Sequence, residues 1–199
     1  MNRITQLDPA GTTGKIKQLF DEVQAKFGTV PNFFRVLGNA PAALEGYLNF
    51  NAALAGGSFS ARVREQIALT VAESNFCGYC MTAHAVIGRK VGLTAKEIAD
   101  AVHAVAVPPK TDAILKLARN VVVERGEVTD AELEQAYACG LTDGEIVETV
   151  ANVALNILTN YVNHLARTVV DFVDGKLSEA GLNRVQDHTG ADYDSAKQN

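Results

Sequence analysis

Helical periodicity runs through almost the whole chain, and it is the feature that most limits what the chain can fold into. Apolar residues recur at spacings of three and four, which place them on one face of a helix. The clearest early example comprises Ile16, Leu19, Phe20, Val23 and Phe27. No segment alternates convincingly between apolar and polar residues; residues 120–124 come nearest, and they lie inside a helical pattern. The sequence therefore predicts an all-α protein.

Start and stop signals divide this pattern into helices of ordinary length. Gly28 is typical of a helix stop, and proline or serine opens the helices expected from Pro31, Pro41 and Ser60. Another helix is expected from about Cys77 to Val91, and one after Pro108 and Pro109 that ends near Gly126. Capping boxes predict three further starts, at Thr94 with Glu97, Thr129 with Glu132, and Thr142 with Glu145. The last helix is expected to run from about Asp143 to Val173.

Length and composition indicate one globular domain. The chain has 199 residues, of which 47% are apolar and 21% charged. We expect the domain to occupy residues 1–175, and residues 176–199, which lack periodicity, to form a polar, flexible tail.

Charge and hydropathy narrow the classes of partner. The net charge of −5 and the lack of a basic patch argue against nucleic acid. No apolar run approaches 18 residues, so we expect no membrane span, and residues 1–14 contain no signal-peptide core. We therefore expect a cytoplasmic protein, in which an isolated CxxC pair is more often catalytic than structural.

The segment "ESNFCGYCMTAH" (73–84) carries the chemistry. Successive residues of a helix turn by about 100°, so Cys77, Cys80 and His84 share one face, and the same face continues in apolar residues. The cysteines fall in or beside the first turn of the helix, where free N–H groups and the helix dipole favour a thiolate. A histidine one turn further on can bond that thiolate or carry its proton.

The preceding helix contributes a carboxylate. On a helical wheel of residues 61–74, Glu65 falls inside an apolar arc, whereas Glu73 lies on a polar strip. A carboxylate among apolar neighbours needs a partner, so Glu65 is the functional candidate and Glu73 an ordinary surface charge. The structural alternative for Glu65 is a salt bridge, with Arg64 or with Arg62 of another subunit.

Three interpretations of the cysteine pair remain open at this point. A redox-active dithiol explains the pair, the histidine on the same face and the helix start together. A zinc site needs about four ligands and finds only Cys77, Cys80 and His84, so no metal is expected. A non-catalytic dithiol sensor or metal-responsive module would use the same residues. Cys139 has no nearby partner in the sequence and is expected to be a buried small residue.

The last helix carries a polar stripe: Glu145, Thr149, Asn152, Asn156, Asn160, Asn163 and Arg167. We expect this stripe to face solvent; its many asparagines and few lysines or glutamates would also suit a subunit interface.

The motif E-x11-C-x2-C-x3-H, formed by Glu65, Cys77, Cys80 and His84, resembles the core motif of the AhpD-like alkylhydroperoxidases, which belong to the carboxymuconolactone decarboxylase family. The segments "VPNFFRVLGNAPAAL" (30–44) and "NYVNHLA" (160–166) are similar to those of the longer, peroxidase-related members. The resemblance covers roughly residues 15–175. It implies an AhpD-like helical bundle with the CxxC at the start of a central helix, assembled as a homotrimer or hexamer.

The resemblance also implies a thiol peroxidase that acts on hydroperoxides. Cys80 would be the attacking thiolate and Cys77 the resolving thiol, while His84 and Glu65 would relay protons. No bound cofactor is implied; an external dithiol, thioredoxin-like or lipoyl, would act as reductant. Decarboxylases of the superfamily act on a lactone acid and lack the CxxC, so the dithiol argues against that activity.

One residue departs from the family pattern. The best-characterised branch has a second histidine at the position of Tyr79. A tyrosine is a poor base near neutrality because its pKa is high, but it can donate a hydrogen bond. Tyr79 is therefore expected to have at most a supporting role.

Overall fold

The computed structural model describes residues 3–171, and in that range it contains α-helices, one short 3-10 helix and no strand. The predicted all-α class is confirmed. The helices are α1 (Gly14–Phe27), α2 (Asn32–Leu37), α3 (Pro41–Ala55), α4 (Ala61–Ser74), α5 (Gly78–Lys90), α6 (Ala95–Val102), α7 (Pro109–Val123), α8 (Asp130–Ala138) and α9 (Asp143–Ala166), and the 3-10 helix is Pro9–Gly11. The expected tail, residues 176–199, lies outside the described residues.

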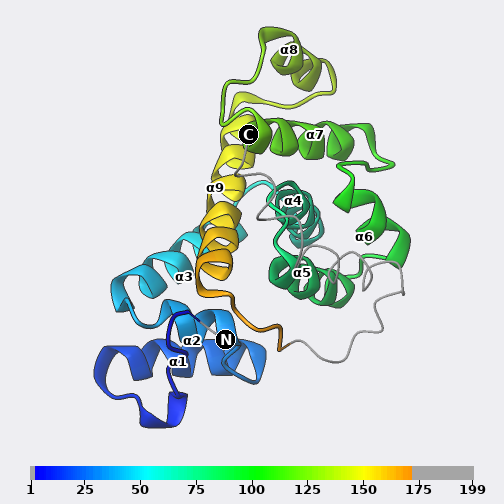
Figure 1. Ribbon diagram of the computed structural model, residues 1–199. Coiled ribbons are helices and arrows are strands. Elements are labelled where there is room, and N and C mark those ends of the chain that lie inside the picture. The colour runs from blue at the N-terminus through cyan, green and yellow to red at the C-terminus, as the bar shows by residue number, and fades with distance from the viewer. Residues whose placement is uncertain (1–2, 172–199) are drawn as a thin grey trace, which may run out of the picture.

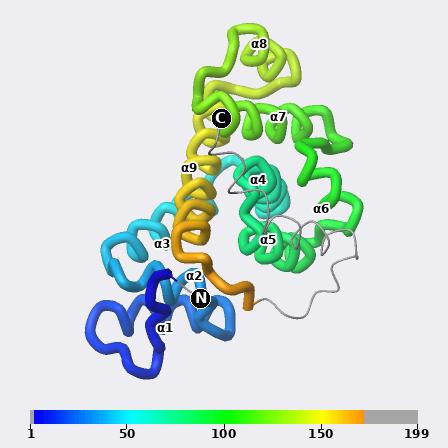
Figure 2. The backbone as a smooth tube through the Cα atoms, viewed as in Figure 1, coloured from blue at the N-terminus to red at the C-terminus, as the bar shows by residue number. Residues whose placement is uncertain are grey.

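Helix α4 is the centre of the fold. It packs against α5, α6, α7 and α9, and its residues from Gln66 to Ala72 are all buried. Figure 1 shows α1, α2 and α3 gathered at one end of α9 and α7 and α8 at the other. The tube in Figure 2 shows the same arrangement, with α4 and α5 beside α9. The helix that carries the CxxC is thus held between the central helix and the first three helices.

The local signals explain most helix boundaries. Gly28 ends α1 in the left-handed conformation, with φ of 79°, which glycine adopts without steric cost. All three predicted capping boxes are present, with the threonine oxygen and the glutamate side chain each accepting a main-chain N–H. Ser60 caps α4 by accepting a hydrogen bond from the N–H of Val63.

The predicted end of the last helix is wrong. Helix α9 stops at Ala166, because Arg167 adopts the left-handed conformation with φ of 51°. The N–H of Thr168 then bonds the carbonyl of Asn163, which closes the helix end. Arginine seldom takes this conformation, so nothing in the sequence marked the stop.

Two apolar clusters form the interior. One is built mainly from α4, α6 and α7 with the start of α9, and the other from α1, α2, α3 and the first turns of α5. Cys77, Tyr79 and Cys80 belong to the second cluster. The cysteine pair therefore lies where the first three helices pack on α5, rather than on an open surface.

The polar stripe of α9 faces inwards, so the prediction that it lies in solvent is wrong. Thr149, Asn152, Asn156, Asn160 and Asn163 are all buried. Several of these side chains donate to a carbonyl one turn earlier in the same helix, as Asn152 does to Glu148 and Asn156 to Asn152. Such bonds satisfy a short polar side chain without water, which is why the stripe can be buried.

The opposite face of α9 is apolar and exposed. It carries Val147, Val150, Ala154, Leu158, Tyr161 and Leu165. These residues follow one another at intervals of three and four, and between Val147 and Leu165 no charged residue lies on the same face, because Glu148 is directed to the N–H groups of Ser58 and Phe59. Within residues 3–171, no helix is both long enough and apolar enough to cross a membrane.

Candidate active site

The start of α5 holds the two cysteines in the predicted position. Phe76, with φ of 55°, turns the chain out of α4, and Cys77 becomes the N-cap of α5. The Cys77 sulfur accepts a hydrogen bond from the N–H of Cys80 at 3.3 Å. Cys80 itself lies in the first turn, so both sulfurs lie at the positive end of the helix dipole.

Cys77 and Cys80 are joined by a disulfide, and both are almost fully buried, with exposed fractions of 1% and 2%. The spacing of three residues on a helix start brings the two sulfurs together without moving the backbone. The pair is therefore arranged for reversible oxidation within one turn of chain. Cys139, expected to be buried, is a free, half-buried cysteine at the edge of the other cluster.

Glu65 and His84 form the pair that the sequence placed on adjacent helices. Glu65 Oε2 lies 2.8 Å from His84 Nδ1, and the two side chains are 17% and 19% exposed. The salt-bridge alternative fails within this chain, because Arg64 bonds the carbonyl of Phe59 and Arg62 bonds Glu97. An ionised Glu65 fixes a hydrogen on Nδ1, which leaves Nε2 of a neutral imidazole as the acceptor.

Asn163, from the buried stripe of α9, contacts the pair from the other side. Its Nδ2 lies 3.4 Å from the sulfur of Cys80, within hydrogen-bond distance for sulfur. Its Oδ1 is buried and has no hydrogen-bond partner among the described residues. From the sequence, Asn163 could be recognised only as part of a polar stripe, because no local pattern links it to Cys80, which lies 83 positions earlier.

Tyr79 is held away from proton transfer. Its hydroxyl accepts the N–H of Phe33 at 3.2 Å and donates to Asp171 at 3.0 Å. Burial raises the pKa of Tyr79 far above its ordinary value, and the negative charge of Asp171 adds to this effect. Tyr79 therefore supports α2 and the end of the described chain rather than serving as a base.

Replacing this tyrosine with phenylalanine (Tyr79→Phe) is expected to lower the free energy of unfolding by about 1–2 kcal/mol, because the N–H of Phe33 loses its partner in the interior. Denaturant titration of the variant and the natural chain measures the difference. An unchanged midpoint of denaturant unfolding would show that the hydroxyl of Tyr79 does not contribute to stability.

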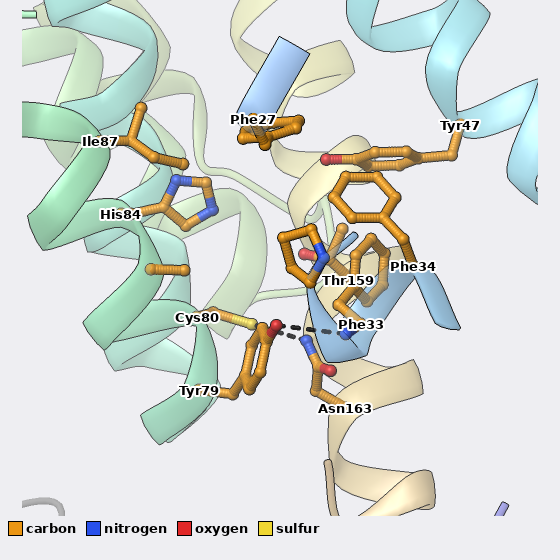
Figure 3. Close-up of a pocket in the computed structure, with 12 residues that line it drawn as sticks. Phe27, Phe33, Phe34, Tyr47, Tyr79, Cys80, His84, Ile87, Thr159 and Asn163 are labelled. Atoms are coloured by element: carbon orange, nitrogen blue, oxygen red, sulfur yellow. Dashed lines mark hydrogen bonds between the residues drawn. The ribbon is translucent and has the colours of Figure 1, made fainter. Parts of the chain in front are cut away.

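A small pocket opens beside Cys80 and His84 (Figure 3). Its volume is about 50 Å³, and its walls are mainly aromatic and aliphatic. The residues that line it are Phe27, Pro31, Phe33, Phe34, Tyr47, Tyr79, Cys80, Ala83, His84, Ile87, Thr159 and Asn163. Cys77 is not among them, so Cys80 is the sulfur that faces the pocket.

Tyr47 is one of the pocket residues that the sequence analysis did not identify. It comes from α3, and its ring stacks edge-on against Phe33 and Phe34. Burial, and to a smaller extent the charge of Glu65, raises the pKa of Tyr47, so its hydroxyl stays protonated. Figure 3 shows that hydroxyl directed into the pocket.

His84 and Cys80 face the pocket together but are not bonded to each other. Over residues 3–171 the hydrogen bond of His84 goes to Glu65, and neither cysteine sulfur accepts from its ring. A proton that passes between the imidazole and the sulfur must therefore cross the pocket. In the same part of the chain, no three histidine, cysteine, aspartate or glutamate side chains are placed to hold a metal ion.

Comparison with known proteins shows which family this arrangement resembles. A model of the carboxymuconolactone decarboxylase family matches residues 41–124, which run from α3 to the end of α7 and include Glu65, both cysteines of the pair and His84. This part of the chain is similar to the carboxymuconolactone decarboxylase family. The resemblance to its AhpD-like members that the motif indicated is confirmed.

Solved structures with this fold support the assignment. A peroxidase-related protein from Ralstonia eutropha JMP134, described as an alkylhydroperoxidase AhpD core, is 26% identical with a TM-score of 0.77, covering 86% of this chain and 93% of its own. A peroxidase-related protein from Silicibacter sp. TM1040 is 20% identical with a TM-score of 0.75, covering 85% and 91%. The likeness to the first of these, at 26% identity, indicates an oxidoreductase at the level of the family.

A third neighbour shares the fold at lower identity. It is the debrominase Bmp8, seen as a cysteine-to-alanine variant in complex with 2,3,4-tribromopyrrole. It is 13% identical with a TM-score of 0.76, covering 93% of this chain and 98% of its own. No curated protein sequence matched the chain.

Proposed function

We propose that this protein, which matches the carboxymuconolactone decarboxylase family over residues 41–124, is a thiol-dependent hydroperoxide reductase. The observation that carries the proposal is the disulfide-forming pair Cys77 and Cys80, of which Cys80 faces a pocket beside a histidine held by a partly buried carboxylate. A dithiol, an acid–base group and an apolar binding space are the parts that such a reaction needs.

In the first step His84 Nε2 takes the proton of the Cys80 thiol, and the resulting thiolate attacks the terminal oxygen of the hydroperoxide. The S–O bond forms as the O–O bond breaks, and the departing alkoxide takes a proton from the His84 imidazolium and leaves as an alcohol. Glu65 stabilises that imidazolium through the bond to Nδ1. The sulfur is oxidised to a sulfenic acid, and the peroxide is reduced by two electrons.

In the second step the Cys77 thiol condenses with the sulfenic acid, which forms the disulfide and releases water. An external dithiol then restores both thiols by exchange and becomes a disulfide itself. Attack on Cys80 is favoured, because Cys80 faces the pocket and Cys77 leaves as a thiolate that already accepts the N–H of Cys80. We propose a thioredoxin-like protein or a lipoyl group as that dithiol, in the reducing cytoplasm.

The pocket favours small hydroperoxides. A volume of about 50 Å³ accommodates a few groups the size of a water molecule, since each occupies about 10–15 Å³ on the same measure. The aromatic walls from α2 and α3 suit a short alkyl group better than a charged one. We propose short-chain alkyl hydroperoxides as the substrate class.

The test is an assay of the purified chain with hydrogen peroxide, tert-butyl hydroperoxide and a long-chain lipid hydroperoxide, each with dithiothreitol, thioredoxin and dihydrolipoamide as reductants. We expect turnover with the small hydroperoxides and with at least one dithiol. The panel also includes a brominated pyrrole, because the debrominase Bmp8 shares the fold. Debromination without any hydroperoxide consumption would overturn the proposal, as would stoichiometric zinc on the isolated protein.

We also propose that the chain assembles with copies of itself through the exposed face of α9. That face presents Val147, Leu158, Tyr161 and Leu165 to solvent. Apolar residues at alternating intervals of three and four suit packing against another helix. Because no charge interrupts the face, a symmetry-related copy meets no like-charge repulsion.

The double variant Tyr161→Glu, Leu165→Glu is expected to dissociate the oligomer to monomers of 21.2 kDa, because it buries two charges in each copy of the interface. Light scattering after size exclusion measures the mass. Val123→Glu, an exposed valine at the end of α7, is the matched control and should leave the mass unchanged. A natural chain that is already monomeric would refute the assembly.

A further inference from the structure

Asn163 makes a contact that its neighbours on α9 do not make. Asn152 and Asn156, on the same buried face, donate their side-chain N–H groups to carbonyls of their own helix. Asn163 instead donates to the sulfur of Cys80, at 3.4 Å. The residue is 5% exposed and lines the pocket. The helix therefore presents the amide of Asn163 to the reacting atom, whereas the amides of Asn152 and Asn156 bond its own backbone.

The orientation of that amide leaves a polar atom unsatisfied. Asn163 Oδ1 is buried and bonds to no partner within residues 3–171. A buried carbonyl oxygen without a hydrogen bond is unfavourable, and such atoms concentrate where function requires them. The opposite orientation would set Oδ1 against Cys80, and a carbonyl oxygen repels a thiolate. Asn163 Oδ1 is therefore left without a partner because the same amide directs its N–H at the sulfur of Cys80.

We propose that Asn163 is a further catalytic residue, whose side-chain N–H stabilises the Cys80 thiolate. A hydrogen bond to an ionised sulfur is stronger than one to a disulfide sulfur, so the contact favours the reduced, charged state. This contact complements the main-chain N–H of Cys80, which donates a hydrogen bond to the sulfur of Cys77. Each sulfur of the pair therefore has its own donor, and the donor to Cys80 comes from a different helix.

This inference rests on the proposed function for the reaction that the thiolate performs, but the acidity of Cys80 can be measured without any hydroperoxide. One unit of pKa changes the thiolate fraction about tenfold below the pKa, whereas the matching gain in nucleophilicity recovers about threefold. The net effect on peroxide oxidation is only about threefold. The pKa of the thiol is consequently the decisive measurement.

The experiment uses the full chain with the substitutions Cys77→Ser and Cys139→Ser, which leave Cys80 as the one thiol of the three in the sequence. Asn163→Leu is added to this parent, because leucine keeps the approximate volume and removes the N–H. Asn156→Leu, a buried asparagine of the same helix that does not touch sulfur, is the matched control. The rate of alkylation by iodoacetamide is followed as a function of pH.

We expect Asn163→Leu to raise the thiol pKa by about one unit or more, as loss of a hydrogen bond to a charged group does. Asn156→Leu should leave it at the parent value. Asn163→Asp, which keeps the shape of the amide and sets a negative charge near the sulfur, should raise the pKa further. The equilibrium of the two-cysteine protein with dithiothreitol should shift towards the disulfide in the Asn163→Leu variant.

An equal thiol pKa in the parent, Asn163→Leu and Asn163→Asp overturns the inference, and so does an equal rise in Asn156→Leu. A raised pKa in a protein that consumes no hydroperoxide supports the role of Asn163 and refutes the proposed function. Hydroperoxide turnover with an unshifted pKa does the reverse. The two proposals therefore fail separately.

Discussion

Cys80→Ser is expected to abolish hydroperoxide turnover, down to the rate observed without protein. Cys80 is the sulfur that faces the pocket, and a serine hydroxyl in its place does not ionise near neutral pH. The fall should be the same for every hydroperoxide in the panel, since all would react at the same sulfur. Consumption of tert-butyl hydroperoxide in the presence of a dithiol measures it.

Two companion variants separate the roles of the cysteines. Cys77→Ser should still consume one equivalent of hydroperoxide per chain without reductant, because the attacking sulfur remains, but it forms no internal disulfide. Cys139→Ser, remote from the pocket, should keep the natural turnover. Turnover in Cys80→Ser equal to that of the natural chain would remove Cys80 from the mechanism.

Glu65→Gln is expected to slow turnover by about 100-fold, the lower end of the contribution of a positioned acid–base group. Glutamine keeps the size of the side chain and can still bond His84 Nδ1, but it lacks the negative charge that stabilises the imidazolium. The loss should appear in kcat more than in KM, because the charge matters when the proton moves. Steady-state kinetics with tert-butyl hydroperoxide measure both.

The matched control is Glu73→Gln, on the same helix but outside the pocket. It removes the same charge from the chain and should leave kcat unchanged. An equal loss in both variants would mean that the net charge of α4, rather than the bond to His84, supports catalysis.

The half of the candidate site that α4 and α5 provide could be predicted because its geometry is local. Cys77, Cys80 and His84 lie within two turns of one helix, so their shared face follows from helix geometry alone. Glu65 required one further inference, that a carboxylate in an apolar arc needs a partner, and the structure supplies His84 as that partner. Two neighbouring helices in a hairpin bring such residues together with few alternatives.

The contribution of α9 could not be predicted, because periodicity identifies a face but not what covers it. A row of asparagines normally indicates solvent, yet here the helix backbone accepts the side-chain N–H groups of Asn152 and Asn156, and the row packs inwards. Only the tertiary contact between α9 and α5 shows that Asn163 meets Cys80. The aromatic walls from α2 and α3 depend on long-range packing in the same way.

The C-terminal end of α9, at the left-handed Arg167, could not be predicted either. Helix stops are recognised in sequence through glycine or proline, and the observed stop uses neither. Its effect is to turn the chain towards α2, where Asp171 accepts hydrogen bonds from Tyr79 and from the N–H of Asn32. Tyr79, at the position where the motif resemblance places a second histidine, therefore holds that turn through its bond to Asp171.

The exclusion of Cys77 from the pocket has a consequence for reaction order. Under the proposed function, the hydroperoxide and the reducing dithiol would both reach Cys80 through this pocket, whose volume of about 50 Å³ does not hold both at once. The alcohol product would then leave before the reductant enters, and each substrate would meet a different oxidation state of the same sulfur. Such an enzyme follows ping-pong kinetics, and a large excess of either substrate competes with the other for access to the pocket.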